Sequence, residues 1–238
     1  MTDNEVDSVL KWAVEVPHEV DGAVVERVSN TVLLALRPVR PLPSERVITS
    51  VLMIIFFLVA TLGATYLGFS GSHVLSRAEN LVISWVLALL AGWAATATAA
   101  AMLPGSKSRF DARILLAICT GAFVAVFAIL FHDYRLVRFF SEGINCLGIG
   151  LLHAAVAGFL LWLVLRRGVI LDPVAAGVAL GTLAGLSGLV MLEMHCPILK
   201  AMHLIVWHTA VIPLSGLVGY LAGRLVQERG NRIFPKEA

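Results

Sequence analysis

Residues 193–208 concentrate polar side chains between two long apolar runs. They read Glu193-Met194-His195-Cys196-Pro197-Ile198-Leu199-Lys200-Ala201-Met202-His203-Leu204-Ile205-Val206-Trp207-His208. The segment holds one cysteine, three histidines, a glutamate and a lysine, and a further cysteine, Cys146, opens an earlier apolar run. The apolar runs around these two places decide the fold class.

The chain is much more apolar than a soluble protein. Its mean hydropathy is +0.87 and only 14% of its residues are charged, whereas about 25% is usual for a soluble domain. Six apolar runs are long enough to cross a bilayer as helices; they are residues 47–69, 81–103, 114–131, 144–165, 174–192 and 201–223. Because lipid offers no hydrogen-bond partner to the backbone, we predict an all-α integral membrane protein, a six-transmembrane-helix bundle.

The distribution of basic residues predicts the orientation of the bundle. Six spans place both termini on one side, and twelve lysines and arginines lie near the ends of the spans on that side: Arg37, Arg40, Arg46, Lys107, Arg109, Arg113, Arg166, Arg167, Arg224, Arg229, Arg232 and Lys236. The opposite side has four: Arg77, Arg135, Arg138 and Lys200. Since cytoplasmic loops carry the excess of basic residues, we expect both termini in the cytoplasm. This asymmetry also accounts for the net charge of +2, so we expect no direct nucleic-acid partner.

Residues 1–46 form the one sizeable soluble segment, followed by the membrane domain at 47–226 and a cytoplasmic tail at 227–238. An arm of this length cannot bury much of a core by itself. Within it, residues 19–36 have the spacing of an amphipathic helix, with Val24, Val28 and Val32 in an i, i+4 row. The helix either lies on the inner membrane surface or folds on a cytoplasmic partner, for which the three valines are the candidate contacts.

The two cysteines at the edges of the membrane runs are expected to meet. Cys146 is 20 positions before Arg166, and Cys196 is 23 positions after Pro173. At about 1.5 Å per residue, both lie about 30–34 Å from the cytoplasmic ends of adjacent antiparallel helices. Both therefore reach the outer membrane–water boundary at similar height. In a Gram-negative cell that boundary faces the oxidising periplasm, where disulfides persist. Cys119 lies inside the third run and is expected to be an inert packing residue.

Three roles for the cysteine pair remain open at this point: a structural disulfide, a redox-responsive thiol pair, or a metal-responsive site. For the last of these, the candidate ligands are Cys146, His195, Cys196 and His203, a set that suits a soft or borderline ion such as zinc, copper or cadmium. Cys146 and Cys196 do not form the C-x-x-C motif that is typical of metal sites, so we assign no firm cofactor. Inside the spans, His153 and His208 are the membrane-embedded polar residues, and His208 is the better functional candidate because ionisable groups there are costly.

Several of these segments together resemble a known family. The residues that carry the resemblance are Gly143, Ile144, Asn145, Cys146, Gly150 and Leu151; Leu165, Arg166, Arg167, Gly168 and Pro173; Ala176, Gly177, Gly181, Ala184 and Gly185; His195, Cys196, Pro197, His203, Trp207 and His208; Gly219, Gly223 and Arg224; and Pro38, Val39, Arg40, Pro41, Leu42 and Pro43. Over about residues 30–226 the chain is similar to the NrsF family, negative regulators of sigma F. The arm before Pro38 is longer than the family's short helix.

The resemblance implies a membrane anti-sigma factor. Such a protein holds an extracytoplasmic-function sigma factor at the inner membrane, and the resemblance implies that Cys146 and Cys196 sense periplasmic metal or oxidative stress. Two other classes compete with this interpretation, a membrane redox protein that uses thiols or haem and a small-solute transporter. A membrane thiol oxidoreductase would need a vicinal cysteine pair, and a haem protein would use His153 with His203 or His208. A small-solute transporter would show carboxylates within its spans, where only Glu193 comes near. We therefore expect no catalytic site.

Overall fold

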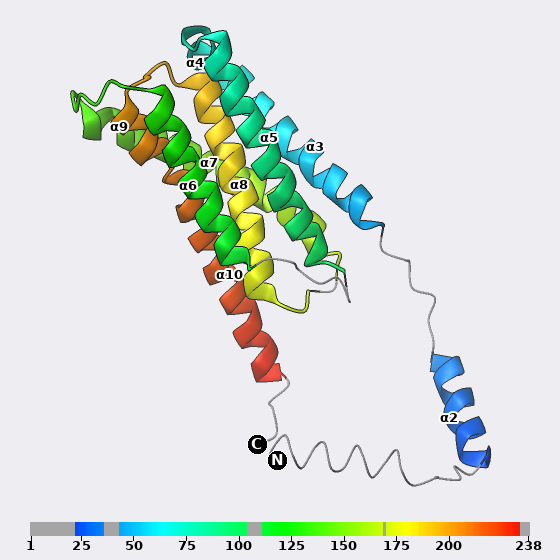
Figure 1. The fold of residues 1–238 in the computed structure, drawn as a ribbon. Coiled ribbons are helices and arrows are strands. Elements are labelled where there is room, and N and C mark those ends of the chain that lie inside the picture. Colours follow the sequence, from blue (N-terminus) through cyan, green and yellow to red (C-terminus); the bar gives the residue numbers. More distant parts are fainter. Residues whose placement is uncertain (1–21, 36–42, 104–110, 169, 234–238) are drawn as a thin grey trace. The chain divides into compact units, whose positions relative to one another are not determined.

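The chain folds into helices throughout the part that the structure describes. The computed structural model describes residues 22–35, 43–103, 111–168 and 170–233 (Figure 1). Its helices are α2 (Gly22–Ala35), α3 (Glu45–Leu67), α4 (Ser70–Val74), α5 (Arg77–Ala100), α6 (Ala112–Leu130), α7 (Phe139–Leu165), α8 (Pro173–His195), α9 (Ala201–His203), η1 (Leu204–His208) and α10 (Val211–Ile233). Six helical segments are long and apolar enough to cross a membrane, which confirms the predicted fold class.

Two compact units divide the chain, Met1–Pro41 and Leu42–Ala238. In the first, helix α2 confirms the amphipathic helix predicted within residues 19–36. Val28 on this helix is 57% exposed. The side chains of Val24 and Val32, and residues 36–42 after the helix, lie outside the described residues.

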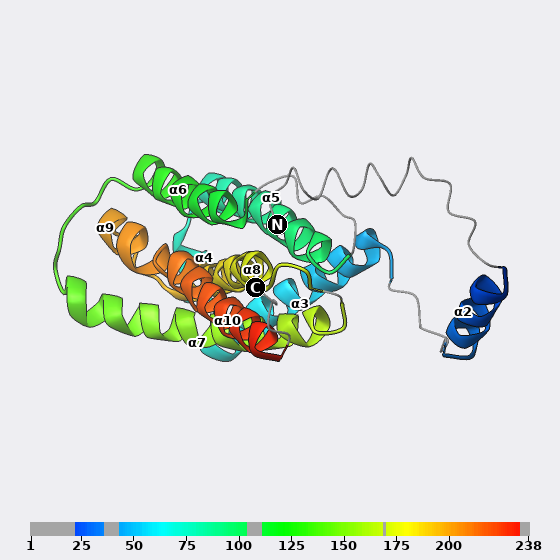
Figure 2. The same ribbon diagram turned by 90° about the horizontal axis from the view of Figure 1, so that it is seen from below.

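Helix α8 is the central helix of the second unit. Figure 2 shows it surrounded by α3, α5, α6, α7 and α10. Its residues are almost continuously buried from Val178 to Glu193, and 83% of its most apolar stretch lies inside the protein. The other five spans bury 22–39% of theirs and turn the remainder outward. A helix that is apolar on all sides has no preferred outer face, which suits the middle of a bundle.

Local signals in the sequence set where several helices begin and end. Helix α8 starts at Pro173, whose missing N–H is not needed in the first turn, and the Asp172 carboxylate accepts hydrogen bonds from the N–H groups of Val174 and Ala175. It ends at His195 because Pro197 disfavours α-helical geometry for the residue before it, and Cys196 is accordingly extended (φ −81°, ψ 118°). Both ends of the central helix are therefore encoded locally.

Glycines bring α8 and α10 into backbone contact. A Cβ atom on Gly219 would clash with the carbonyl oxygen of Gly177, and one on Gly181 would clash with that of Ser215. A Cβ on Gly223 would meet the carbonyl of Pro173. Small residues allow such close approach of helices in membranes, so these glycines serve in the packing of α8 against α10.

Replacing Gly219 by alanine should destabilise the bundle. The methyl group has no space beside the Gly177 carbonyl, and overpacking of this kind costs about 1–3 kcal/mol of unfolding free energy. Thermal unfolding of the purified protein in detergent should show the lower stability. The matched control is Gly121→Ala in α6, where nothing lies within 4 Å of the new atom. Equal stability of the two variants would contradict the packing.

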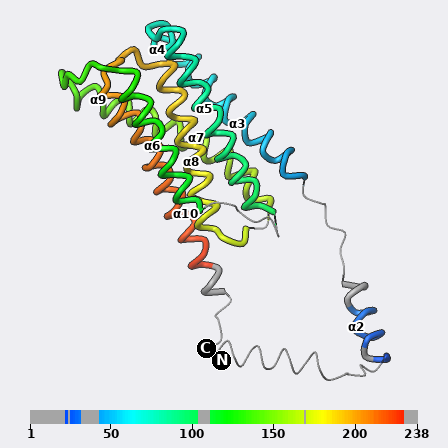
Figure 3. The backbone as a smooth tube through the Cα atoms, viewed as in Figure 1, coloured from blue at the N-terminus to red at the C-terminus, as the bar shows by residue number. Residues whose placement is uncertain are grey.

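The sixth predicted span, 201–223, is helical but not a single α-helix. It begins as the short helix α9, continues through the π-turn η1, and becomes α10 at Val211 (Figure 3). The N–H of Thr209 donates to the carbonyl of Leu204, five residues back. Pro213 has no N–H for the carbonyl of Thr209 and its ring crowds that group. The regular hydrogen-bond pattern is interrupted at this point because of Pro213.

Candidate functional site

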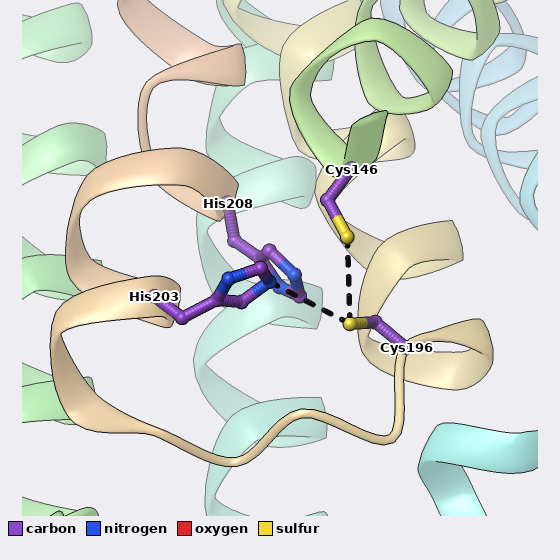
Figure 4. A group of neighbouring side chains, drawn as sticks. All are labelled: Cys146, Cys196, His203 and His208. Atoms are coloured by element: carbon purple, nitrogen blue, oxygen red, sulfur yellow. Dashed lines mark hydrogen bonds between the residues drawn. The ribbon is translucent and has the colours of Figure 1, made fainter. Parts of the chain in front are cut away.

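Four side chains from three segments of the chain meet at one end of the bundle. Cys146 lies in the first third of α7, Cys196 directly follows α8, His203 ends α9 and His208 ends η1. The two sulfur atoms are 3.6 Å apart, and Cys196 Sγ is 3.7 Å from His203 Nε2 (Figure 4). One ligand atom from each of the four residues lies within 4.8 Å of all the others. Both cysteines are free thiols.

The return loop after α8 is held in place by polar contacts. The N–H of Ala201 donates to the carbonyl of Asp133 at 2.8 Å. The Lys200 ammonium group donates to the carbonyl of Val137 at 3.1 Å and lies 3.8 Å from the Glu142 carboxylate. The loop is thereby fixed to the start of α7 and to the segment before it, and Cys196 comes to face Cys146.

The π-turn gives His203 and His208 a common face. Residues five apart are separated by about 140° around an ordinary α-helix, whereas a π-turn bonds residue i to residue i+5 and brings the two into line. The two imidazole rings accordingly lie with centroids 5.0 Å apart. Figure 4 shows both rings directed toward the sulfur of Cys196.

Aromatic packing holds the π-turn against α7. The indole of Trp207 lies against Gly143, where a Cβ atom would clash with the ring. Phe139 and Phe140 pack on the same indole with ring centroids 5.3 and 6.0 Å away. The absence of a side chain at Gly143 therefore lets η1 approach the turn of α7 that carries Cys146.

Glu193 orients the His208 ring. Its carboxylate accepts a hydrogen bond from His208 Nδ1 at 2.7 Å, and the two side chains are 6% and 0% exposed. The other ring nitrogen, Nε2, is buried and has no hydrogen-bond partner among the described residues. A buried polar atom without a partner is costly, so the site holds one nitrogen whose bonding capacity is unused.

His195 is not a member of this group, although it is the neighbour of Cys196 in the sequence. Its Nδ1 donates instead to the carbonyl of Gly68 at the end of α3, at 3.2 Å. Helix α8 ends at His195, and the chain turns at Cys196, so the two side chains diverge. His208 takes the place that the sequence had suggested for His195 among the possible ligands. His153 lies elsewhere, with its Nε2 donating to the carbonyl of Val59 at 2.8 Å, so the structure does not bring it to His203 or His208.

The site is accessible mainly through Cys146. Cys196, His203 and His208 are buried, whereas Cys146 is partly exposed. Helix α4 covers the other side, since a Cβ on Gly71 would clash with the carbonyl of Cys196. The pKa of the Cys196 thiol lies above its ordinary value, chiefly because of its hydrogen bond with Cys146 and its burial, while His203 and His208 act in the opposite direction. The arrangement suits two reactions of thiols: joining as a disulfide and binding a soft or borderline metal ion.

Sequence reasoning identified Cys146, Cys196 and His203 but assigned His208 and Glu193 no place beside them. Pro213 was the available signal, because a proline within an apolar span marks an irregular helix whose residues change face. The third cysteine, Cys119, is fully buried in α6, as expected of a packing residue.

The comparison with known proteins bears on the whole second unit. The family model for negative regulator of sigma F matches residues 34–227. No curated protein and no solved structure matches the chain significantly. Because the matching region covers most of the chain, including five of the six apolar spans, nearly all of the sixth and the four clustered residues, the protein belongs to the NrsF family of anti-sigma factors.

Proposed function

We propose that this protein holds an extracytoplasmic-function sigma factor at the bacterial inner membrane and releases it when Cys146 and Cys196 react with a periplasmic signal. Both termini are cytoplasmic in this proposal, and helix α2 of the arm binds the sigma factor. The observation that carries it is the 3.6 Å separation of the sulfur atoms of Cys146 and Cys196, two residues that are 50 positions apart in the sequence.

The position of the thiols suits a signal from the far side of the membrane. The arm joins the bundle ahead of Glu45, at the start of α3. The thiols lie at the other end of this helix, because His195 bonds the carbonyl of Gly68 there. With 23 residues, α3 is about 34 Å long, enough to separate a periplasmic sensor from a cytoplasmic output.

Helix α3 is also the element through which the bundle can act on the arm. Three side chains of α7 and α8 are bonded to its backbone carbonyls: His153 to Val59, Ser187 to Phe56, and His195 to Gly68. A change in the packing of α7 against α8 would alter these contacts and bias the position of α3. Such a switch works if the arrangements of the helices before and after the signal differ in free energy by only a few kcal/mol.

Two kinds of signal fit the thiol pair. A peroxide oxidises one thiol to a sulfenic acid and is itself reduced to an alcohol or water. The second thiol then displaces water from the sulfenic acid and a disulfide forms. Alternatively, a soft metal ion binds both sulfurs and their two protons leave to solvent. Either event joins α7 to the end of α8.

Co-purification tests the proposed function directly. Full-length protein extracted in detergent from membranes of its own host should carry a sigma factor of the extracytoplasmic-function class, identified by mass spectrometry. Brief exposure of intact cells to peroxide or Cd²⁺ before extraction should reduce the recovered amount. The control is a chain without residues 1–46, which should recover none. If the full-length protein carries no sigma factor before exposure, or holds it equally after, the proposal is wrong.

A further inference from the structure

We infer that Cys146, Cys196, His203 and His208 form a closed tetrahedral site for a divalent ion of the zinc class, Zn²⁺ or Cd²⁺, with Glu193 positioning His208. The ion's role as the regulatory ligand rests on the proposed function, whereas the site itself rests on the geometry of the four side chains. Compared with the ligand set predicted from the sequence, His208 takes the place of His195, and the Glu193 carboxylate supports His208 from outside the set.

The distances fit a four-coordinate ion. Zinc–sulfur bonds of about 2.3 Å and zinc–nitrogen bonds of about 2.0 Å place the ligands of a tetrahedral ion about 3.3–3.8 Å from one another. The sulfur–sulfur distance of 3.6 Å and the sulfur–nitrogen distance of 3.7 Å are already within this range. All four ligand atoms lie within 4.8 Å of one another, so an ion needs only small side-chain adjustments.

The ring nitrogen of His208 points to the same conclusion independently. Among the described residues three buried side-chain N or O atoms have no partner: Thr49 Oγ1, Trp207 Nε1 and His208 Nε2. Of these, His208 Nε2 belongs to the cluster of thiols and imidazoles. A neutral imidazole that donates from Nδ1 to the Glu193 carboxylate carries its lone pair on Nε2, where a metal ion can bind. A carboxylate bonded to the far nitrogen of a ligating histidine is the usual outer support of a zinc site.

The donor set selects the class of ion. Two thiolates and two imidazoles in a tetrahedral arrangement are typical of zinc rather than of Mg²⁺ or Ca²⁺, which take oxygen ligands. Four protein ligands leave no open position for water, so the site is of the structural or regulatory kind and not hydrolytic. The two thiol protons leave when the ion binds. Because both sulfurs are then occupied, metal binding and disulfide formation exclude each other.

Titration of the reduced full-length protein in detergent with Co²⁺ tests this site, since cobalt reports its geometry by absorption. We expect one Co²⁺ per chain, the intense visible bands of a tetrahedral ion, thiolate charge-transfer absorption, and loss of both when Zn²⁺ is added. Cys146→Ser, Cys196→Ser, His203→Ala and His208→Ala should each lose this spectrum. Glu193→Leu should keep it but bind about 10–100-fold more weakly, with Glu193→Gln in between, because the amide oxygen can still accept from Nδ1.

The matched controls are Cys119→Ser, a thiol outside the cluster, and His195→Ala, the imidazole next to Cys196 that faces Gly68; both should bind like the unaltered protein. X-ray absorption of the unaltered Zn²⁺-loaded protein should show two sulfur and two imidazole ligands, a result that needs no variant to fold. Three results would overturn the inference. The first is a His208→Ala variant that keeps the tetrahedral spectrum and the affinity for Co²⁺. The others are a Zn²⁺-loaded protein without two imidazole ligands and a reduced protein that binds no Co²⁺. Metal binding as expected, with no release of a sigma factor by either metal or peroxide, would leave the site standing and refute the proposed function instead.

Discussion

Replacement of Cys146 by serine is expected to abolish induction of the sigma-dependent genes by Cd²⁺ or peroxide, and Cys196→Ser is expected to do the same. The two sulfurs are 3.6 Å apart, and neither can form a disulfide or share an ion without the other. The double variant should therefore be no worse than either single one, since the two groups act as a unit. A reporter gene behind a promoter of the sigma factor measures the response, with membrane levels of each variant checked by immunoblot.

Cys119→Ser is the control for this experiment. It removes a thiol of the same chain that is fully buried in α6 and is not part of the cluster, so it should respond normally. If the two single variants of the pair differ from each other, or if both still respond, the pair serves at most as a structural link and the signal is received elsewhere.

The second large effect is expected in the arm. Val28→Asp should release the sigma factor and switch on its target genes without any signal. Val28 is exposed on α2 and available to a groove in a partner, where a buried unpaired carboxylate costs about 3–5 kcal/mol. Each 1.4 kcal/mol is about a tenfold loss of affinity, so binding should weaken by at least about 100-fold. The reporter in unstressed cells and co-purification of the sigma factor measure the effect.

Asn30→Asp is the matched control for Val28→Asp. It introduces the same charge two residues further along, about 160–200° around the helix, where it would face away from a bound partner. Asn30 is exposed in α2 as well, so this variant should remain repressed. If Val28→Asp also stays repressed while the protein accumulates normally, the valine row is a membrane-surface helix and the sigma factor is held by another part of the arm.

The predicted spans agree with the structure because their signal is strong and local. A run of about 20 apolar residues can satisfy its backbone in lipid only as a helix, and all six were found near their expected bounds. The two ends of helix α8 were also encoded locally, by Pro173 at its start and by Pro197 after its end. Cys146 and Cys196 meet, as predicted, for the same reason, since helical rise converts sequence distance into position along a helix.

The composition of the site depended on rotation about the helix axes, which sequence distance does not give. His195 is adjacent to Cys196 in the sequence, yet it faces α3, because α8 ends between the two residues. His208 is twelve residues beyond Cys196 and within a span, yet the π-turn before Pro213 aligns it with His203. Adjacency along the chain was therefore a poor guide to membership of the cluster.

The sequence by itself determined that the chain is a six-helix membrane protein with two thiols at one depth, because hydrophobic length and helical rise are properties of each segment alone. Only the tertiary structure decided that α8 is the central helix, that Glu193 bonds His208, and that the side chains of two cysteines and two histidines converge. These features arise from the close contact of α8 with α10 at Gly177 and Gly219 and from the packing of Trp207 on Gly143. Both contacts depend on how helices far apart in the chain rotate against one another, and that rotation is set by the packing of all of them together.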